Sequence, residues 1–129
     1  MGMSNLDIVR AIQDGTAGGE IRTGKAFYAE DFTLREAPSL PYGGTFRGAA
    51  GLEDFIARHE ATWAERSFAV LRYVEAGDQV ICLVELTARS RRTGETITMQ
   101  VTEWWTLRDG QVIDIHEFYF DTAAVAAIA

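Results

Sequence analysis

Glu103 is the residue of this sequence whose position most clearly points to chemistry. It lies in the stretch Met99-Gln-Val-Thr-Glu-Trp-Trp-Thr-Leu-Arg-Asp-Gly110, where apolar and polar residues alternate as in a strand with one buried face. Five apolar residues would share its face: Ile97, Met99, Val101, Trp105 and Leu107. A carboxyl buried among them loses solvation when it ionises, so its pKa should rise and it could exchange a proton near neutral pH. The alternative without a catalytic role is that Glu103 is paired with His116 or an arginine, or that it lies close enough to the strand end to be exposed to solvent.

The partner of Glu103 depends on the turn formed by Asp109-Gly110, which admits two hairpins. In a two-residue type I′ turn, Glu103 sits opposite His116. In a three-residue loop with Gly110 as the left-handed bulge residue, Glu103 faces Ile115 and Glu117 lies diagonally across from it. Because a slip of one residue turns a whole strand over, the sequence leaves open whether His116 or Glu117 faces the site.

The elements that would position these groups change in kind along the chain. Helices are predicted from Leu6 to Gly15 after a capping box at Ser4, from Glu20 to Glu30, and from Leu52 to Trp63, with a short strand from Phe32 to Ala37. Four strands should follow: Phe68 to Glu75, Gln79 to Arg89, Glu95 to Leu107 and Gln111 to Asp121. This order predicts one α+β domain over 1–129, a cone-shaped curved antiparallel sheet packed by three N-terminal helices. Such a curled sheet would leave a ligand cavity beneath the helices.

Composition argues against several classes of partner. The chain has 129 residues, a formal charge of -7 and a pI of about 4.7, which disfavours nucleic acid. The one basic run, Arg89-Ser90-Arg91-Arg92, is expected to be a solvated hairpin tip. No apolar run is long enough to span a membrane. One cysteine, Cys82 between apolar neighbours, predicts a buried thiol in a reducing, cytoplasmic compartment.

No cofactor or metal site is predicted. Two histidines and one cysteine, well apart in the sequence, do not make a closed zinc site, and no glycine-rich loop opens a helix after a strand. The last strand also carries apolar residues on both faces, including Val112, Phe118 and Phe120 against Ile113, Ile115 and Tyr119. The outer face of the sheet therefore needs a cover, and a second copy of the chain, forming a homodimer, is the expected one.

Three stretches together resemble the NTF2-like superfamily, and are most similar to its SnoaL-like branch and to ketosteroid isomerases. They are Tyr28-Ala-Glu-Asp-Phe-Thr-Leu-Arg-Glu-Ala-Pro38, then Leu-Pro-Tyr-Gly-Gly-Thr-Phe-Arg-Gly48, and the closing Glu-Phe-Tyr-Phe-Asp121. The likeness covers nearly the whole chain. It implies a cone-shaped α+β domain, commonly a homodimer, with a pocket between the helices and the concave face of the sheet.

The resemblance also implies roles for individual residues. Glu36 falls where ketosteroid isomerases carry the aspartate that shuttles the proton, and Glu103 where they carry the protonated aspartate of the oxyanion hole. Tyr28 matches a supporting tyrosine of some members. The sequence differs at two positions, because the oxyanion tyrosine of the first helix falls near Ile12, and Ile56 stands where a further tyrosine would.

Two other enzyme groups share the implied fold. Limonene-epoxide hydrolases use two aspartates and an arginine to activate water; Glu103 and Glu117 would fall on the two acids in the bulged hairpin, and Val101 stands in place of the arginine. Polyketide cyclases of the SnoaL type use a carboxylate or a histidine in the pocket, which this sequence could supply.

The leading hypothesis is a homodimeric, cofactor-free acid–base enzyme, an isomerase, cyclase or hydrolase, that acts on a small apolar organic molecule of the carbonyl or epoxide type. Glu36 or Glu117 would be the base, protonated Glu103 would stabilise the oxygen on which charge develops, and His116 would act in the opposite register. The expected pocket walls, which could equally be plain core, are Tyr28, Phe55, Trp63, Trp105 and Tyr119. The second hypothesis is a non-catalytic ligand-binding or dimerisation module.

Overall fold

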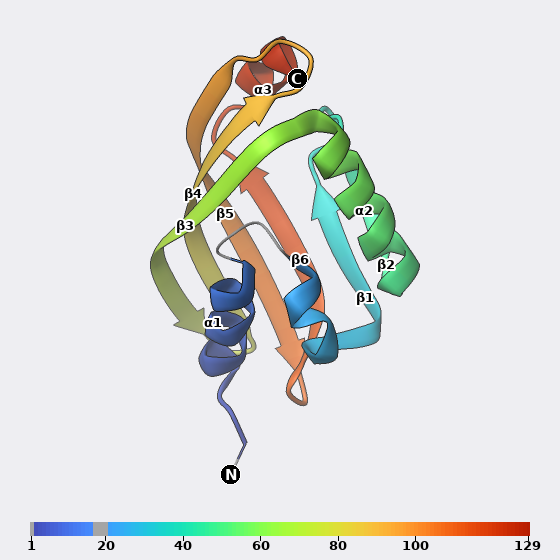
Figure 1. Ribbon diagram of the computed structural model, residues 1–129. Helices are drawn as coiled ribbons and strands as arrows, with labels where there is room; N and C mark the ends of the chain where they lie inside the picture. Colours follow the sequence, from blue (N-terminus) through green and yellow to red (C-terminus); the bar gives the residue numbers. More distant parts are fainter. Residues whose placement is uncertain (1, 17–20) are drawn as a thin grey trace.

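A six-stranded curved sheet forms the body of the protein, with helices against its concave face (Figure 1). The computed structural model describes residues 2–16 and 21–129. Along the chain the elements are α1 (Asn5–Thr16), the 3-10 helix η1 (Ile21–Phe27), β1 (Tyr28–Glu36), β2 (Gly44–Arg47), α2 (Gly48–Thr62), β3 (Trp63–Ala76), β4 (Gln79–Ser90), β5 (Thr96–Arg108), β6 (Gln111–Tyr119) and α3 (Thr122–Ile128). In the described part of the chain, no helix is both long enough and apolar enough to cross a bilayer.

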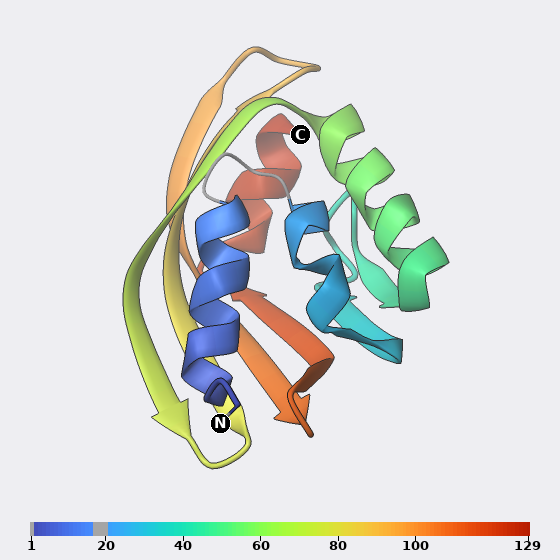
Figure 2. The same ribbon diagram turned by 60° about the horizontal axis from the view of Figure 1, so that its bottom comes forward.

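The strand order is β2-β1-β6-β5-β4-β3, and Figure 2 shows the sheet curving around α1 and η1. The predicted α+β architecture is confirmed, with two differences. The sheet is mixed, because β1 runs parallel to β6 while the other pairs are antiparallel. The third α-helix, α3, follows the last strand instead of preceding the sheet. The last strand was predicted from Gln111 to Asp121 and ends earlier, at Tyr119.

The segment predicted as a helix from Glu20 to Glu30 is mostly a different structure. Glu20 lies outside the described residues; η1 ends at Phe27 and β1 begins at Tyr28. The strand therefore begins earlier than the predicted Phe32, because Tyr28 already pairs with Val112 of β6. Phe32, Leu34 and Glu36 follow the two-residue period of a strand and are all buried.

Helix α1 is fixed at its start and along one face. The backbone N–H of Asp7 donates to Ser4 Oγ at 3.0 Å, and the N–H of Ser4 donates to Asp7 Oδ2 at 3.2 Å, which confirms the predicted capping box. Its buried stripe comprises Ile8, Val9, Ile12 and Gln13, so one polar side chain is carried into the core with the apolar ones.

The basic hairpin tip between β4 and β5 is exposed, as expected, and its arginines also bind the ends of two helices. Arg91 Nε donates to the carbonyl of Glu60 at 2.6 Å, near the C-terminus of α2. Arg92 Nε donates to the carbonyl of Ala129 at 2.8 Å, just after α3. Cations and N–H donors are favoured at helix C-termini, where carbonyl groups lack partners within the helix.

The β5–β6 hairpin has the turn of one predicted hairpin, but beyond that turn it follows neither predicted register, because Glu103 pairs with Glu117. Asp109 and Gly110 have φ of 53° and 75°, as a two-residue type I′ turn requires, and Arg108 pairs with Gln111. A β-bulge at Ile113 then shifts the register by one residue. In a regular strand, residues three apart face opposite sides, yet the bulge lets Val112 and Ile115 both be buried, at 0% and 1% exposure.

Candidate functional site

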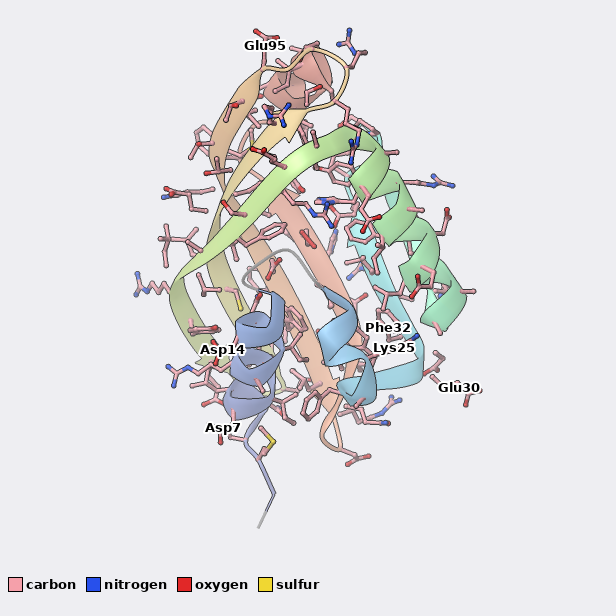
Figure 3. All side chains as sticks on the ribbon, viewed as in Figure 1. Asp7, Asp14, Lys25, Glu30, Phe32 and Glu95 are labelled. Carbon is pink, nitrogen blue, oxygen red and sulfur yellow. The ribbon has the colours of Figure 1, made fainter. Side chains whose placement is uncertain are left out.

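Three glutamates from neighbouring strands meet in the buried layer beneath the helices. Glu36 ends β1, Glu103 is on β5 and Glu117 is on β6, which lies between those strands. Their exposures are 4%, 8% and 8%, respectively. As a result of the bulge, Glu103 and Glu117 are direct cross-strand partners. By contrast, the acids Asp7, Glu30 and Glu95, labelled in Figure 3, extend into solvent.

Glu103 is held by two N–H donors on a single oxygen. Gln13 Nε2, from α1, donates to Glu103 Oε1 at 2.5 Å, and Trp105 Nε1 donates to the same oxygen at 3.2 Å. Burial raises the pKa of Glu103, and these two hydrogen bonds act in the opposite direction.

Glu36 has no such support. Neither of its carboxyl oxygens has an N–H donor among the described residues. The pKa of Glu36 is raised to about 8 in all: burial raises it most, a hydrogen bond with Glu117 lowers it, and the charge of Glu103 raises it. Since two ionised carboxylates cannot hydrogen-bond to each other, this bond forms when the carboxyl of Glu117 is protonated.

Glu117 is the carboxyl that holds its proton most firmly. Burial raises its pKa well above the ordinary value, and the charges of Glu36 and Glu103 raise it further. None of the described lysines, arginines and histidines contributes to the pKa of these three carboxyls. Like charges this close in a buried site disfavour full ionisation, so the group keeps protons at neutral pH.

Tyrosine hydroxyls surround the carboxyls. Tyr28 Oη is buried without a hydrogen-bond partner among the described residues, and the charges of Glu103 and Glu117 raise the pKa of Tyr28. The charges of Glu36 and Glu117 likewise raise the pKa of Tyr119. Two phenol groups that stay protonated thus lie within electrostatic reach of the carboxyls.

Tyr119 ends a short hydrogen-bonded chain. Trp63 Nε1 donates to Tyr42 Oη at 3.2 Å, and the hydroxyls of Tyr42 and Tyr119 are 2.8 Å apart. Because the indole N–H can only donate, Tyr42 accepts that bond. Either hydroxyl can donate in the bond between Tyr42 and Tyr119, so the chain links the indole of Trp63 to the hydroxyl of Tyr119.

The structure brings together most of the residues predicted for the site. Glu36, Glu103 and Glu117 are buried together, Tyr28 and Tyr119 interact with them, and Trp105 hydrogen-bonds to Glu103. The other two predicted walls contact Tyr42: Trp63 is fully buried and its Nε1 donates to Tyr42 Oη, and Phe55 packs edge-on to Tyr42 with ring centroids 6.0 Å apart.

His116 is placed on the opposite face of the sheet. It pairs with Trp104 rather than with Glu103, so the predicted Glu103–His116 unit does not form. The shift at the bulge is the physical reason, since it turns Glu117 inward and His116 outward. A surface hollow of about 360 Å³ contains His116 together with Trp104, Phe118, Gln79, Thr106 and the ion pair of Arg35 with Asp114.

Sequence reasoning missed Gln13 and Tyr42, both of which contact predicted site residues. A signal for Gln13 existed, because it lies four residues after Val9 on the buried stripe of α1. Tyr42 lies between two turns of a loop, where nothing in the pattern indicates a fully buried side chain. Within the described ranges, no group of three or more His, Cys, Asp or Glu residues is arranged to hold a metal ion.

Comparisons with known proteins agree with this architecture. The family model of the SnoaL-like domain matches residues 9–115. A search of curated proteins gave no match. An NTF2-like protein from Burkholderia thailandensis is 23% identical, with a TM-score of 0.91 and coverage of 98% of both chains.

Two other solved structures carry more specific names. One is a putative SnoaL-like polyketide cyclase from Jannaschia, which is 19% identical with a TM-score of 0.80, over 99% of this chain and 96% of that one. The other, TerC co-crystallised with polyporic acid, is 24% identical with a TM-score of 0.85, over 96% of each chain. The family match covers most of the sequence, from α1 to β6, and the fold extends the likeness to nearly all of it. The chain therefore belongs to the SnoaL-like domain family of the NTF2-like superfamily.

Proposed function

We propose that this protein is an acid–base enzyme that acts on a small apolar organic molecule of the carbonyl or epoxide type without a cofactor. The observation that carries the proposal is the group of three buried carboxyls, Glu36, Glu103 and Glu117, whose pKa values are all raised by burial. Carboxyls with pKa values near neutrality can accept and return protons at physiological pH.

The chemistry follows from a cluster that is partly protonated. An ionised carboxyl removes a proton from the carbon next to a carbonyl, or from a water molecule that attacks an epoxide. In the first case the C–H bond breaks, an O–H bond forms on the carboxyl, and the carbonyl oxygen takes up negative charge. A protonated neighbour stabilises that oxygen by donating a hydrogen bond. Return of the proton to a different carbon completes an isomerisation.

Tyr28 and Tyr119 would assist at the developing oxyanion. Both phenols stay protonated, and Tyr28 Oη has no partner among the described residues that would compete with a substrate. Ketosteroid isomerases carry an oxyanion tyrosine near the position where this chain has the buried Ile12. Tyr28 and Tyr119 would supply the hydrogen-bond donors that Ile12 lacks. The family membership and the polyketide cyclase neighbour support a cyclisation or an isomerisation, and the TerC neighbour supports an aromatic or quinone-like ligand.

The test is exchange of solvent deuterium into a panel of enolisable ketones, together with hydrolysis of a panel of epoxides. Wild-type protein is expected to accelerate one of these reactions. Substituting Glu36→Gln, Glu103→Gln or Glu117→Gln should each lower kcat by about 100-fold or more, as expected for loss of a general acid or base. The matched control is Glu30→Gln, an exposed acid on β1, which should leave kcat unchanged. Turnover that persists undiminished in all three core variants would refute the proposal.

A second candidate is a non-catalytic ligand-binding or dimerisation module, which the outer face of the sheet favours. The exposed large apolar side chains on and next to that face are Leu71, Val74, Trp104, Phe118 and Phe120. Large apolar groups gathered on one face are typical of an interface. We therefore also propose a homodimer through this face, in either functional case, and a cytoplasmic location, for which the single buried, free cysteine is the support.

Sedimentation equilibrium tests the dimer. Wild-type protein is expected to have twice the monomer mass, and a Trp104→Lys, Phe118→Lys double variant should be monomeric with an unchanged fold by circular dichroism. Glu95→Lys, at the exposed hairpin tip, is the control and should stay dimeric. If the wild-type protein is still a monomer at about 100 µM, a concentration at which even weak complexes form, the dimer is excluded.

A further inference from the structure

We propose that Glu103 is the carboxylate of this site, and that Gln13 is the positioning residue that keeps it ionised and aims its Oε2 at the substrate. Only the catalytic consequence rests on the proposed function; the distribution of charge among the three glutamates stands without it. The assignment differs from the sequence-based expectation, in which Glu103 holds the proton.

The distribution of hydrogen-bond donors distinguishes the three carboxyls. Glu103 Oε1 accepts from Gln13 Nε2 at 2.5 Å and from Trp105 Nε1 at 3.2 Å. Neither oxygen of Glu36 has an N–H donor among the described residues, and its hydrogen bond is with the carboxyl of Glu117. Donors to a carboxylate stabilise the ionised form, so a buried negative charge is better supported on Glu103 than on Glu36.

The effects of the three carboxyls on one another's pKa values also favour Glu103 as the ionised group. Ionised Glu103 raises the pKa of Glu36 and of Glu117, whereas the opposing hydrogen bonds of Gln13 and Trp105 act on Glu103 itself. Glu117 then keeps its proton and can donate it to Glu36 or to a substrate oxygen. The site thus has a base on β5 and an acid directly opposite on β6.

Gln13 is held in place by elements remote in sequence from Glu103. The capping box at Ser4 fixes the start of α1, and Val9 and Ile12 anchor its buried face. The same amide also forms a hydrogen bond with the thiol of Cys82, the cross-strand neighbour of Glu103. Burial raises the pKa of Cys82 to about 12, so this thiol stays neutral and does not compete for the charge.

The geometry gives one atom the role of base. Two donors occupy Glu103 Oε1, so Oε2 is the oxygen that accepts the proton from carbon or water. When the C–H bond breaks, its proton goes to Oε2, its electron pair forms the new C=C bond, and the carbonyl oxygen becomes an oxyanion beside protonated Glu117. Gln13 does not touch the substrate in this scheme; it acts through Glu103.

Carbon-13 NMR of protein labelled at the glutamate carboxyl carbons tests the assignment directly, with signals assigned by the three Glu→Gln variants. In wild-type protein, Glu103 should titrate at the lowest pH of the three. Gln13→Leu should raise the pKa of Glu103 by about 1, and Trp105→Phe should raise it also, because each removes a donor to the carboxylate. Gln111→Leu, the same change at an exposed position, should leave it unchanged.

The sign of the shift decides the outcome. If Glu103 were protonated and donated its hydrogen to the amide oxygen of Gln13, Gln13→Leu would lower its pKa, and that result would overturn the proposal. Titration of Glu36 or Glu117 at a lower pH than Glu103 in wild-type protein would also overturn it, and this test does not need Gln13→Leu or Trp105→Phe to fold. Absence of turnover would count against the proposed function alone.

Once a substrate is known, the pH profile adds a second test. The acidic limb of kcat/KM should move up by about 1 pH unit in Gln13→Leu, following the base, while kcat at high pH stays within about threefold of wild type. A uniform loss of activity at all pH values, with no shift of the limb, would show that Gln13 has a merely structural role.

Discussion

Glu103 and Glu117 lie directly opposite each other on β5 and β6, with both carboxyls buried. Like charges at a direct cross-strand position destabilise a sheet, and burial increases the cost. Such a pair is tolerated when at least one member carries a proton. The protein thus holds an acidic group in a form that an ordinary surface glutamate does not have at neutral pH.

Stability should fall as the pH rises from about 5 to 8. Burial raises the pKa of Glu36 from 4.5 to about 8, so in this window the folded state binds a proton that the unfolded state has released. The stabilising contribution is complete below the unfolded value and is lost as the pH passes through the folded one. Urea unfolding should show a decrease of a few kcal/mol, and Glu36→Gln should flatten the dependence. The exposed control Glu30→Gln should keep the wild-type slope; a stability that increases from pH 5 to 8 would contradict this account.

Removing the hydroxyl of Tyr42 should cost more than an ordinary hydrogen bond. Tyr42→Phe leaves the indole N–H of the fully buried Trp63 without its partner, and an unpaired buried donor costs about 1–3 kcal/mol. In the double variant with Trp63→Phe that donor is absent, so the two losses should not add. A thermodynamic cycle from denaturant unfolding measures the coupling, and strictly additive losses would show that the hydrogen bond contributes nothing.

The hairpin tip should lose stability when Ser90 is truncated. Ser90 Oγ donates to the carbonyl of Ile128 at 2.6 Å and accepts from the backbone N–H groups of Arg92 and Thr93, both at 3.2 Å. Ser90→Ala should lower the free energy of unfolding by about 1–3 kcal/mol and speed amide hydrogen exchange in α3. Ser67→Ala, at an exposed position on β3, is the matched control. Unchanged exchange in α3 would argue that the tip does not hold this helix.

Gly24 should not tolerate a side chain. A Cβ at this position would lie 2.5 Å from Ile12 Cγ2 and 3.1 Å from Tyr28 Oη. Gly24→Ala should therefore destabilise the protein by about 1–3 kcal/mol through overpacking between α1 and η1. Gly2→Ala, where nothing lies within 4 Å, serves as the comparison in thermal unfolding. Ile12→Ala, which removes both γ carbons of Ile12, should cost less stability in Gly24→Ala than in wild-type protein; equal costs would point to a backbone cause.

The sequence predicted the burial of Glu103 because strict alternation over a long strand fixes which side chains share a face. It left the orientation of Glu117 open because that depends on one extra residue in β6, and a bulge leaves no clear mark on hydrophobicity. Val112 and Ile115 would both prefer burial, and only a break in the two-residue period satisfies both.

Other misses have equally local causes. The strand β1 begins earlier than predicted because the pairing of Tyr28 with Val112 of β6 outweighs a weak helical pattern around Tyr28. Helix α3 was missed although Asp121 is a good N-cap and accepts from the N–H of Ala124. Gln13 was overlooked because its partner, Glu103, is 90 positions away in the sequence.

The extra residue at position 113 affects how related chains should be compared. Without Ile113, the strand would continue regularly from Val112 to Asp114 and still direct Ile115 and Glu117 inward. A homologue that is one residue shorter at this point would still direct the acid equivalent to Glu117 inward. An alignment without a gap would place that acid one position away from Glu117. Placing a single gap at the bulge, rather than at the turn, is the choice that matches equivalent side chains.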